Sequence, residues 1–336
     1  MTETDKNKLI KEVLAEEEIR FTAYLDEVAS LPLAPSIEKR SFCCNTSRSL
    51  YCPECYKLLI PPAECPLDIA EGDSIELPFV MDIILGRKER RNSSSGIQMM
   101  VIRQMMTQID KEIHRDFQSE GKECPWWTET RLFDLNKGDP VPTYPEELNS
   151  MSSTFVLFPS NNSVPLSSVA NKIKRLVILD IKWTRSGIVQ LDPSLSMLPA
   201  VHLEYPPKVS QFWRWHNGGD GMLSTMEAIY FAAIEMSAAL GWDKERREKI
   251  RNIMWIFALQ RRAIIHQHMV NSGEQDTLPL PFSMEGKKLQ KSFRVRKDGK
   301  DSAARQKRNG QSGFYHERKD EETINETSEK VHADRG

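Results

Sequence analysis

The chain lacks any run of about eighteen consecutive apolar residues, the length that a transmembrane helix needs, so we expect no membrane span. Its first eighteen residues, MTETDKNKLIKEVLAEEE, also lack the apolar stretch behind a basic start that marks a secretory signal. We therefore expect an intracellular protein, in the nucleus, the cytoplasm or both. A strong net charge is missing too: 46 Lys and Arg against 48 Asp and Glu give −2. The low net charge does not exclude nucleic acid as a partner, because the basic residues are concentrated in one part of the chain.

Cysteine is scarce, with six in 336 residues, which argues against a small disulfide-rich secreted scaffold. Five of the six lie between residues 41 and 66, and in a reducing compartment clustered thiols favour metal. The C-x-x-C at Cys52 and Cys55 has zinc-ligand spacing, and the adjacent pair Cys43 and Cys44 would complete four ligands. The alternative is a set of reduced thiols, because a second C-x-x-C is absent. Cys65 is a substitute ligand.

Apolar runs alternate with helical patterns along the middle of the chain. Strands are expected at 77–85, 154–160, 175–180 and 200–205, and helices at 97–109, 164–174, 223–241 and 244–269. The clearest helix begins with a capping box, Ser224 and Glu227, and ends at Gly241. This alternation predicts an α/β domain with a mainly parallel sheet.

The flanking segments differ in composition, and the chain divides into four parts. Residues 1–40 are a charged helical lead-in, 41–66 a Cys-rich element resembling a zinc knuckle, 67–270 the α/β domain, and 271–336 a disordered charged tail. Within the domain, 119–150 is expected to be an irregular loop or insertion. The tail is densely basic from 287 to 308, so phosphate binding is one interpretation and a solvated tail the other. Its candidate RNA contacts are Lys287, Lys288, Arg294, Arg296 and Lys297.

Two constellations in the domain suggest chemistry. An apolar strand delivers Asp180 to its carboxyl end, where parallel sheets bind ligands, and Trp183 follows three residues later. Arg214, between two tryptophans, suits bidentate binding of a carboxylate or phosphate. The N–H groups at the start of the 223–241 helix suit an anion. Each feature also has a purely structural interpretation. Asp180 could cap a loop and Trp183 could pack in the core. Arg214 could stack on a tryptophan at the surface, and the start of the 223–241 helix could be an ordinary helix cap.

Taken together, the order and spacing of these elements resemble the DTW-domain tRNA-uridine aminocarboxypropyltransferases, in particular their eukaryotic branch. The resemblance spans roughly residues 41–265, and its most specific block is L-S-T-x-E-A-I-Y at 223–230. Further matches are Y-C-x-x-C-Y at 51–56, L-P and D-I-I at 77–84, Glu89, F-P-S at 158–160 and F-W-R at 212–214.

Three family elements are altered here. The threonine of D-x-T-W is replaced by Lys182, H-P-x-E reads G-R-K-E at 86–89, and K-S-T reads S-S-S at 93–95. An alternative is therefore a catalytically weak or inert family member that binds RNA or protein. A transferase for another RNA is the second alternative.

The resemblance implies a SPOUT-like fold whose C-terminal knot shapes the cofactor pocket. It also implies transfer of the 3-amino-3-carboxypropyl group of S-adenosylmethionine to N3 of a tRNA uridine. Asp180 is our candidate general base and Trp183 the aromatic face for the sulfonium or the uracil. Lys182 is a candidate RNA contact. The residues expected around the cofactor are Phe158, Pro159, Arg214, Leu223, Ser224, Thr225 and Glu227.

Overall fold

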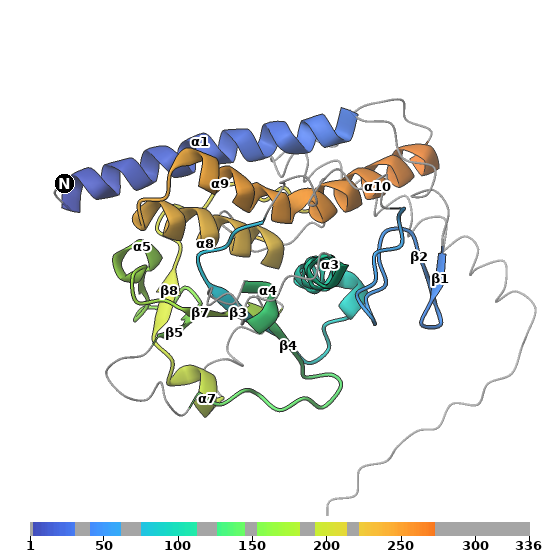
Figure 1. Cartoon of the computed structure of the whole chain (residues 1–336), viewed down its shortest axis with the longest axis horizontal. Helices are drawn as coiled ribbons and strands as arrows, with labels where there is room; N and C mark the ends of the chain where they lie inside the picture. The colour runs from blue at the N-terminus through green and yellow to red at the C-terminus, as the bar shows by residue number, and fades with distance from the viewer. Residues whose placement is uncertain are drawn as a thin grey trace, which may run out of the picture. The chain divides into compact units, whose positions relative to one another are not determined.

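The computed structural model of the chain describes residues 3–30, 41–61, 75–112, 126–144, 153–181, 192–213 and 222–272. A six-stranded parallel sheet organises this part of the chain, with strand order β4-β3-β7-β5-β8-β6 (Figure 1). The expected α/β fold with a mainly parallel sheet is thus confirmed. Its strands are β3 (Val80–Leu85), β4 (Arg131–Asp134), β5 (Thr154–Leu157), β6 (Val164–Pro165), β7 (Arg175–Asp180) and β8 (Ala200–His202).

The two longest strands, β3 and β7, lie side by side at the point where the chain changes direction across the sheet. They are paired over their full length, so that Leu85 lies opposite Asp180 at their carboxyl ends. From β3 the chain proceeds to β4 on one side, whereas from β7 it proceeds to β8 on the other. Ligands of open parallel sheets bind outside the carboxyl ends of the strands at such a switch point.

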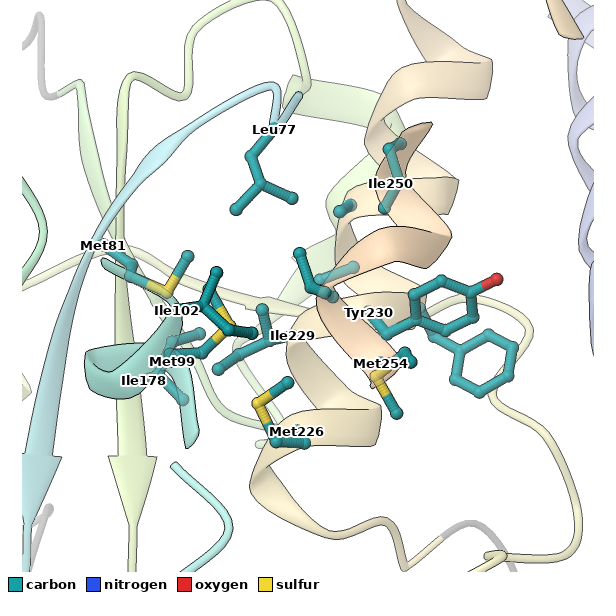
Figure 2. Close-up of a cluster of buried hydrophobic side chains, with 14 of the residues drawn as sticks. Leu77, Met81, Met99, Ile102, Ile178, Met226, Ile229, Tyr230, Ile250 and Met254 are labelled. Carbon is teal, nitrogen blue, oxygen red and sulfur yellow. The ribbon is translucent and has the colours of Figure 1, made fainter. Parts of the chain in front are cut away.

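The main core fills one face of the sheet, beneath α3 (Ile97–Glu112) and α8 (Thr225–Ala239). Figure 2 shows Met81 and Ile178 of the sheet against Met99 of α3 and Ile229 of α8. Helix α8 is apolar on nearly every side, as expected for a helix enclosed by others. Helices α1 (Glu3–Ser30), α9 (Lys244–Arg251) and α10 (Trp255–Ser272) lie on its outer side (Figure 1).

The lead-in helix α1 belongs to this core. Its Phe21 is 2% exposed and packs against Tyr230 and Phe231 of α8. The buried carboxylate of Glu17 accepts hydrogen bonds from the Tyr230 hydroxyl at 2.5 Å and from Arg251 Nη2 at 2.8 Å. Of the expected 1–40 lead-in, Glu3–Ser30 is helical, and the charged composition of this segment did not indicate that residues such as Phe21 are buried.

The opposite face of the sheet holds a smaller core, made by Ile84, Val156, Val177, Leu195 and Leu198 with α7 (Pro193–Ser196). Asp82 projects into it with no exposed surface. Its carboxylate accepts from Arg131, Arg175 and the Tyr144 hydroxyl at distances between 2.6 and 2.9 Å. A buried charge requires such partners, so the aspartate of the L-P…D-I-I element has a structural role.

Three sequence expectations were wrong in part. The 119–150 segment is not entirely irregular, because it contains α4 (Trp126–Glu129) and the edge strand β4. Each of these elements has only four residues, too few to show a periodicity in the sequence. The expected 164–174 helix is only α5 (Leu166–Val169), preceded by β6 at the other edge. The expected 244–269 helix is interrupted by a 3-10 turn at Asn252–Met254. None of the described helices is long and apolar enough to cross a membrane.

Candidate functional site

Asp180 lies at the switch point and is 8% exposed. Its Oδ2 accepts hydrogen bonds from the Ser94 hydroxyl and, at 3.2 Å, from the Gly96 N–H. The Ser94 hydroxyl oxygen in turn accepts from the Ile97 N–H at 3.3 Å, at the start of α3. The carboxylate therefore lies at the positive end of a helix, where negative charge is favoured.

The starts of α3 and α8 meet beside this carboxylate. The Ser95 hydroxyl accepts from the Met226 N–H at 3.2 Å and so joins the two helix starts. Gly96 separates Asp180 from Thr225: a Cβ there would lie 2.6 Å from Asp180 Oδ2 and 3.1 Å from Thr225 Cγ2. The serine turn at 93–95 and the glycine after it thus bring the strand-end aspartate to the L-S-T helix start.

The α8 start is capped internally, and its cap also fixes the preceding loop. The Ser224 side chain and Glu227 form the expected capping box. Glu227 is 1% exposed and also accepts from the Gln211 N–H at 2.6 Å and the Ser210 hydroxyl at 2.7 Å. Burial raises the pKa of Glu227 above its usual value, although these hydrogen bonds oppose the rise. Arg261, 6% exposed, donates to the Gln211 carbonyl from the other side at 3.2 Å.

This clamped loop leads into the F-W-R element. Phe212 and Trp213 lie 4.5 Å apart between ring centroids, and Trp213 packs 5.2 Å from Phe257 of α10. Leu223 is buried in the same core. At the end of β5, Phe158 packs on the opposite face of the sheet, whereas Pro159 is exposed.

The structure therefore brings Asp180 close to Thr225, at the start of the helix that Ser224 and Glu227 cap, and Leu223 is buried just before that cap. Phe158 and Pro159 stand at the same edge of the sheet, at the end of the neighbouring strand β5. The sequence did not single out the roles of Ser94, Ser95, Gly96, Gln211 and Arg261, although S-S-S-G before a helix was a usable capping signal. Nine residues predicted from the sequence as site residues or substitute ligands lie outside the described ranges: Cys65, Lys182, Trp183, Arg214, Lys287, Lys288, Arg294, Arg296 and Lys297.

Four cysteines converge in a separate small element. The hairpin of β1 (Ser41–Cys43) and β2 (Thr46–Arg48) turns through Cys44 and Asn45, both with positive φ, at 47° and 58°. The C-x-x-C segment follows, with Tyr56 also left-handed at φ 63°. The four ligand sulfurs, of Cys43, Cys44, Cys52 and Cys55, all lie within 4.8 Å of one another.

The separations suit a metal. Cys43 Sγ lies 3.5 Å from Cys55 Sγ and 3.9 Å from Cys44 Sγ, and tetrahedral zinc with bonds of about 2.3 Å requires about 3.8 Å between sulfurs. The hydrogen bond to Cys55 raises the pKa of Cys43 to about 12. Burial opposes ionisation of Cys52, but backbone N–H groups of Cys55 and Glu54 outweigh it and lower the pKa of Cys52 to about 7.

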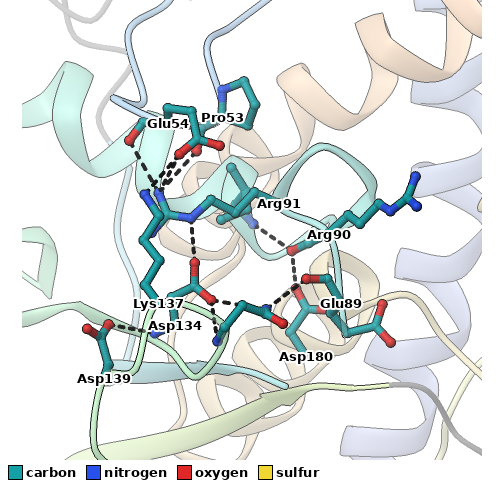
Figure 3. A network of polar contacts seen from close by, with 12 residues as sticks. Pro53, Glu54, Glu89, Arg90, Arg91, Asp134, Lys137, Asp139 and Asp180 are labelled. Atoms are coloured by element: carbon teal, nitrogen blue, oxygen red, sulfur yellow. Dashed lines mark hydrogen bonds and ion pairs between the residues drawn. The ribbon is translucent and has the colours of Figure 1, made fainter. Parts of the chain in front are cut away.

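The Cys element is anchored to the sheet edge by Arg91 (Figure 3). The guanidinium donates to the Glu54 carbonyl at 3.2 Å and to Asp134 Oδ2, at the end of β4, at 2.6 Å. On the other side, the Tyr51 hydroxyl donates to Gln260 of α10 at 3.0 Å, and Gln260 also accepts from Gln98 of α3. The Cys element is thus attached both to the sheet edge and to two core helices.

Residues 49–262 match the model of the DTW domain. Over 259 residues the chain is 24% identical to mouse tRNA-uridine aminocarboxypropyltransferase 1, a match that spans 70% of this chain and 80% of that protein. No solved structure matches the chain. The family match extends from the Cys element through the sheet to α10, and the chain belongs to the DTW-domain family.

Proposed function

We propose that the protein transfers the 3-amino-3-carboxypropyl group of S-adenosylmethionine to N3 of a uridine in tRNA. The observation that carries this proposal is the convergence of Asp180, Gly96 and Thr225 at the switch point of the sheet. They come from three elements of the DTW pattern that are distant in sequence. Family membership and the similarity to mouse tRNA-uridine aminocarboxypropyltransferase 1 suggest the reaction.

The reaction makes three demands on the site. N3 of uridine must lose its proton and attack the γ-carbon of the methionine portion. The bond from that carbon to sulfur then breaks, and neutral 5′-methylthioadenosine leaves with the electron pair. S-adenosylmethionine supplies the activated alkyl group, so the chain's residues need to take a proton, orient two reactants and hold a carboxylate.

Asp180 is the proposed proton acceptor. Hydrogen bonds from the Ser94 hydroxyl and the Gly96 N–H to Oδ2 fix the carboxylate at the end of β7. Trp183 and Arg214 are proposed as the aromatic face and the carboxylate partner, respectively. Phe158 and Pro159 are proposed to border the cofactor from the end of β5.

Thr225 is the proposed contact of α8 with the transferred carboxylate. The N–H groups of Ser224, Met226 and Glu227 already have acceptors. Within the described part of the chain, the N–H and hydroxyl of Thr225 have none, and the residue is partly exposed. Leu223, Ser224 and Glu227 then shape the pocket by holding the helix start rather than by touching the ligand.

Two structural features complete the proposal. The Cys element is proposed to hold one zinc ion, because its four sulfurs fit tetrahedral coordination, and zinc there would stabilise the hairpin and the C-x-x-C segment.

The domain is proposed to be SPOUT-like with a C-terminal knot. The segments that would test the knot, 182–191 and 214–221, lie outside the described residues.

The deciding experiment incubates the full-length protein with S-adenosylmethionine and unmodified tRNA and analyses the nucleosides by mass spectrometry. We expect 3-(3-amino-3-carboxypropyl)uridine and 5′-methylthioadenosine in equal amounts. Binding of S-adenosylmethionine without product, at any enzyme concentration, would instead identify an inert binding module. Modified uridine in ribosomal RNA but not in tRNA would support the alternative that the protein is a transferase for another RNA.

A further inference from the structure

A short basic turn (residues 86–90) follows β3 at the carboxyl edge of the sheet. Three of its five residues are cationic and exposed: Arg87, Lys88 and Arg90. The turn lies directly against the candidate site, because the Gly86 N–H donates to the Asp180 carbonyl at 3.0 Å. A Cβ at Gly86 would lie 2.4 Å from Ile181 Cγ2, so the turn and the end of β7 are in close contact.

The basic turn is held in one conformation by Asn136, from the loop after β4. The Asn136 side-chain oxygen accepts from the Lys88 N–H at 2.6 Å. Its Nδ2 donates to the carbonyls of Glu89 at 2.8 Å and Gly86 at 3.2 Å. Lys88 is left-handed, at φ 73°, and this amide clamp holds it there. A fixed turn presents its cations with little ordering cost on binding.

Two carboxylates near the turn already have cationic partners. Glu54 pairs with Lys137 at 2.9 Å, and Asp134 pairs with Arg91 at 2.6 Å. Figure 3 shows the Arg90 side chain directed away from this network, to which it contributes only its backbone carbonyl. Among the described residues, neither Lys88 nor Arg90 is part of an ion pair. With three cations and the single carboxylate of Glu89, the turn therefore carries a net positive charge.

We propose that the basic turn binds the sugar–phosphate backbone of the substrate RNA beside the nucleotide that enters the Asp180 site. This inference rests on the proposed function for the identity of the RNA. A polynucleotide carries a phosphate next to every base, so cations beside a base-modifying site meet phosphates whenever a base is bound. Here the chain has G-R-K-E where the family pattern has H-P-x-E, so Arg87 adds a cation at the proline position of that pattern.

The test compares Lys88→Gln/Arg90→Gln with Lys172→Gln/Lys174→Gln in the full-length protein. Lys172 and Lys174 are exposed cations just before β7, at the opposite edge of the sheet, so the control removes the same charge. Affinity for a labelled unmodified tRNA transcript is measured over a series of salt concentrations. The turn variant should bind about tenfold more weakly at low salt, and the slope of log affinity against log salt should fall by about 1.5. The control should retain the parent slope.

Three results would overturn the proposal: an unchanged slope in the turn variant, an equal loss in the control, or competition by polyglutamate as strong as by tRNA. The last would identify an acidic peptide as the partner. S-adenosylmethionine affinity by calorimetry should be the same in all three proteins. The affinity for tRNA is measured without turnover, so it tests the basic turn separately from the proposed reaction. Turn-dependent tRNA binding without modified uridine would reject the proposed function alone, and modified uridine without turn dependence would reject this inference alone.

Discussion

Asp180, at the end of β7, accepts a hydrogen bond from the hydroxyl of Ser94, which lies 86 positions earlier in the chain. The same hydroxyl oxygen accepts from the first turn of α3. The aspartate is thus both a helix-capping group and the proposed proton acceptor, and the two roles predict different behaviour on substitution.

Asp180→Asn tests the two roles directly. The asparagine oxygen can still accept from Ser94 and Gly96, so the fold and S-adenosylmethionine affinity should be retained, whereas a proton acceptor is lost. We expect turnover to fall about a hundredfold or more. Ser94→Ala removes one hydrogen bond but keeps the carboxylate and should cost less than about tenfold. Equal, small losses in both variants, measured as kcat at saturating substrate, would leave Asp180 as a cap only.

Gly96→Ala should disturb the site more than the fold. The added methyl would lie 2.6 Å from Asp180 Oδ2 and 3.3 Å from Ile83 Cγ2, so the carboxylate must move. We expect about 1–3 kcal/mol of destabilisation and weaker S-adenosylmethionine binding. Gly138→Ala is the control, because its φ of 85° strains an alanine while nothing lies within 4 Å of the added atom. If both variants bind S-adenosylmethionine as the parent does, Gly96 does not border the ligand.

The sequence predicted this site only in part, for physical reasons. Continuous apolar runs revealed β3 and β7, and the end of β7 identified Asp180. No local pattern indicates that Ser94 and Gly96 meet it, because that contact depends on how α3 packs on the sheet. The edge strand β4 has only four residues, two of them charged, so its composition resembles a loop. The anchoring of Glu54 by Arg91 likewise joins positions 37 apart and has no sequence signature.

The Cys cluster predicts a metal stoichiometry. Purified protein should contain about one equivalent of zinc by elemental analysis. Cys52→Ser/Cys55→Ser should release it and expose the hairpin to proteolysis, because the metal replaces a hydrophobic core in so small an element. Cys124→Ser, at a cysteine far from the C-x-x-C segment in the sequence, should keep the metal. Metal-free parent protein with an intact, protease-resistant hairpin would refute the zinc site.

Glu227→Gln should destabilise the domain through the 210–212 loop. Glu227 accepts from two backbone N–H groups, those of Gln211 and Ser224, on different oxygens. A glutamine presents one oxygen only, so either orientation leaves a buried N–H opposite another donor. We expect a loss of about 1–3 kcal/mol in the free energy of urea unfolding. Glu245→Gln, an exposed charge removal on α9, should be near neutral, and equal effects in the two variants would contradict this account.

Glu235 on α8 predicts a pH dependence of stability. It has no exposed surface, and its two oxygens accept from the backbone N–H groups of Ser167 at 3.2 Å and Glu204 at 3.0 Å. Burial is the main cause that raises the pKa of Glu235 to about 7, and the nearby Glu204 carboxylate adds to it.

The direction follows from proton binding. Between pH 4.5, the ordinary value, and about 7, the folded protein holds a proton on Glu235 that the unfolded chain has lost. The free energy of unfolding therefore rises as the pH falls from about 7 towards 4.5, by about 3 kcal/mol at most. This contribution is lost when the pH is raised again to about 7. Glu235→Gln cannot titrate, so its free energy of urea unfolding should vary less over this range. Because all other groups titrate in both proteins, the difference between the two curves isolates Glu235. Its slope should approach about 1.4 kcal/mol per pH unit, and parallel curves at pH 5, 6 and 7 would show that Glu235 is ionised throughout.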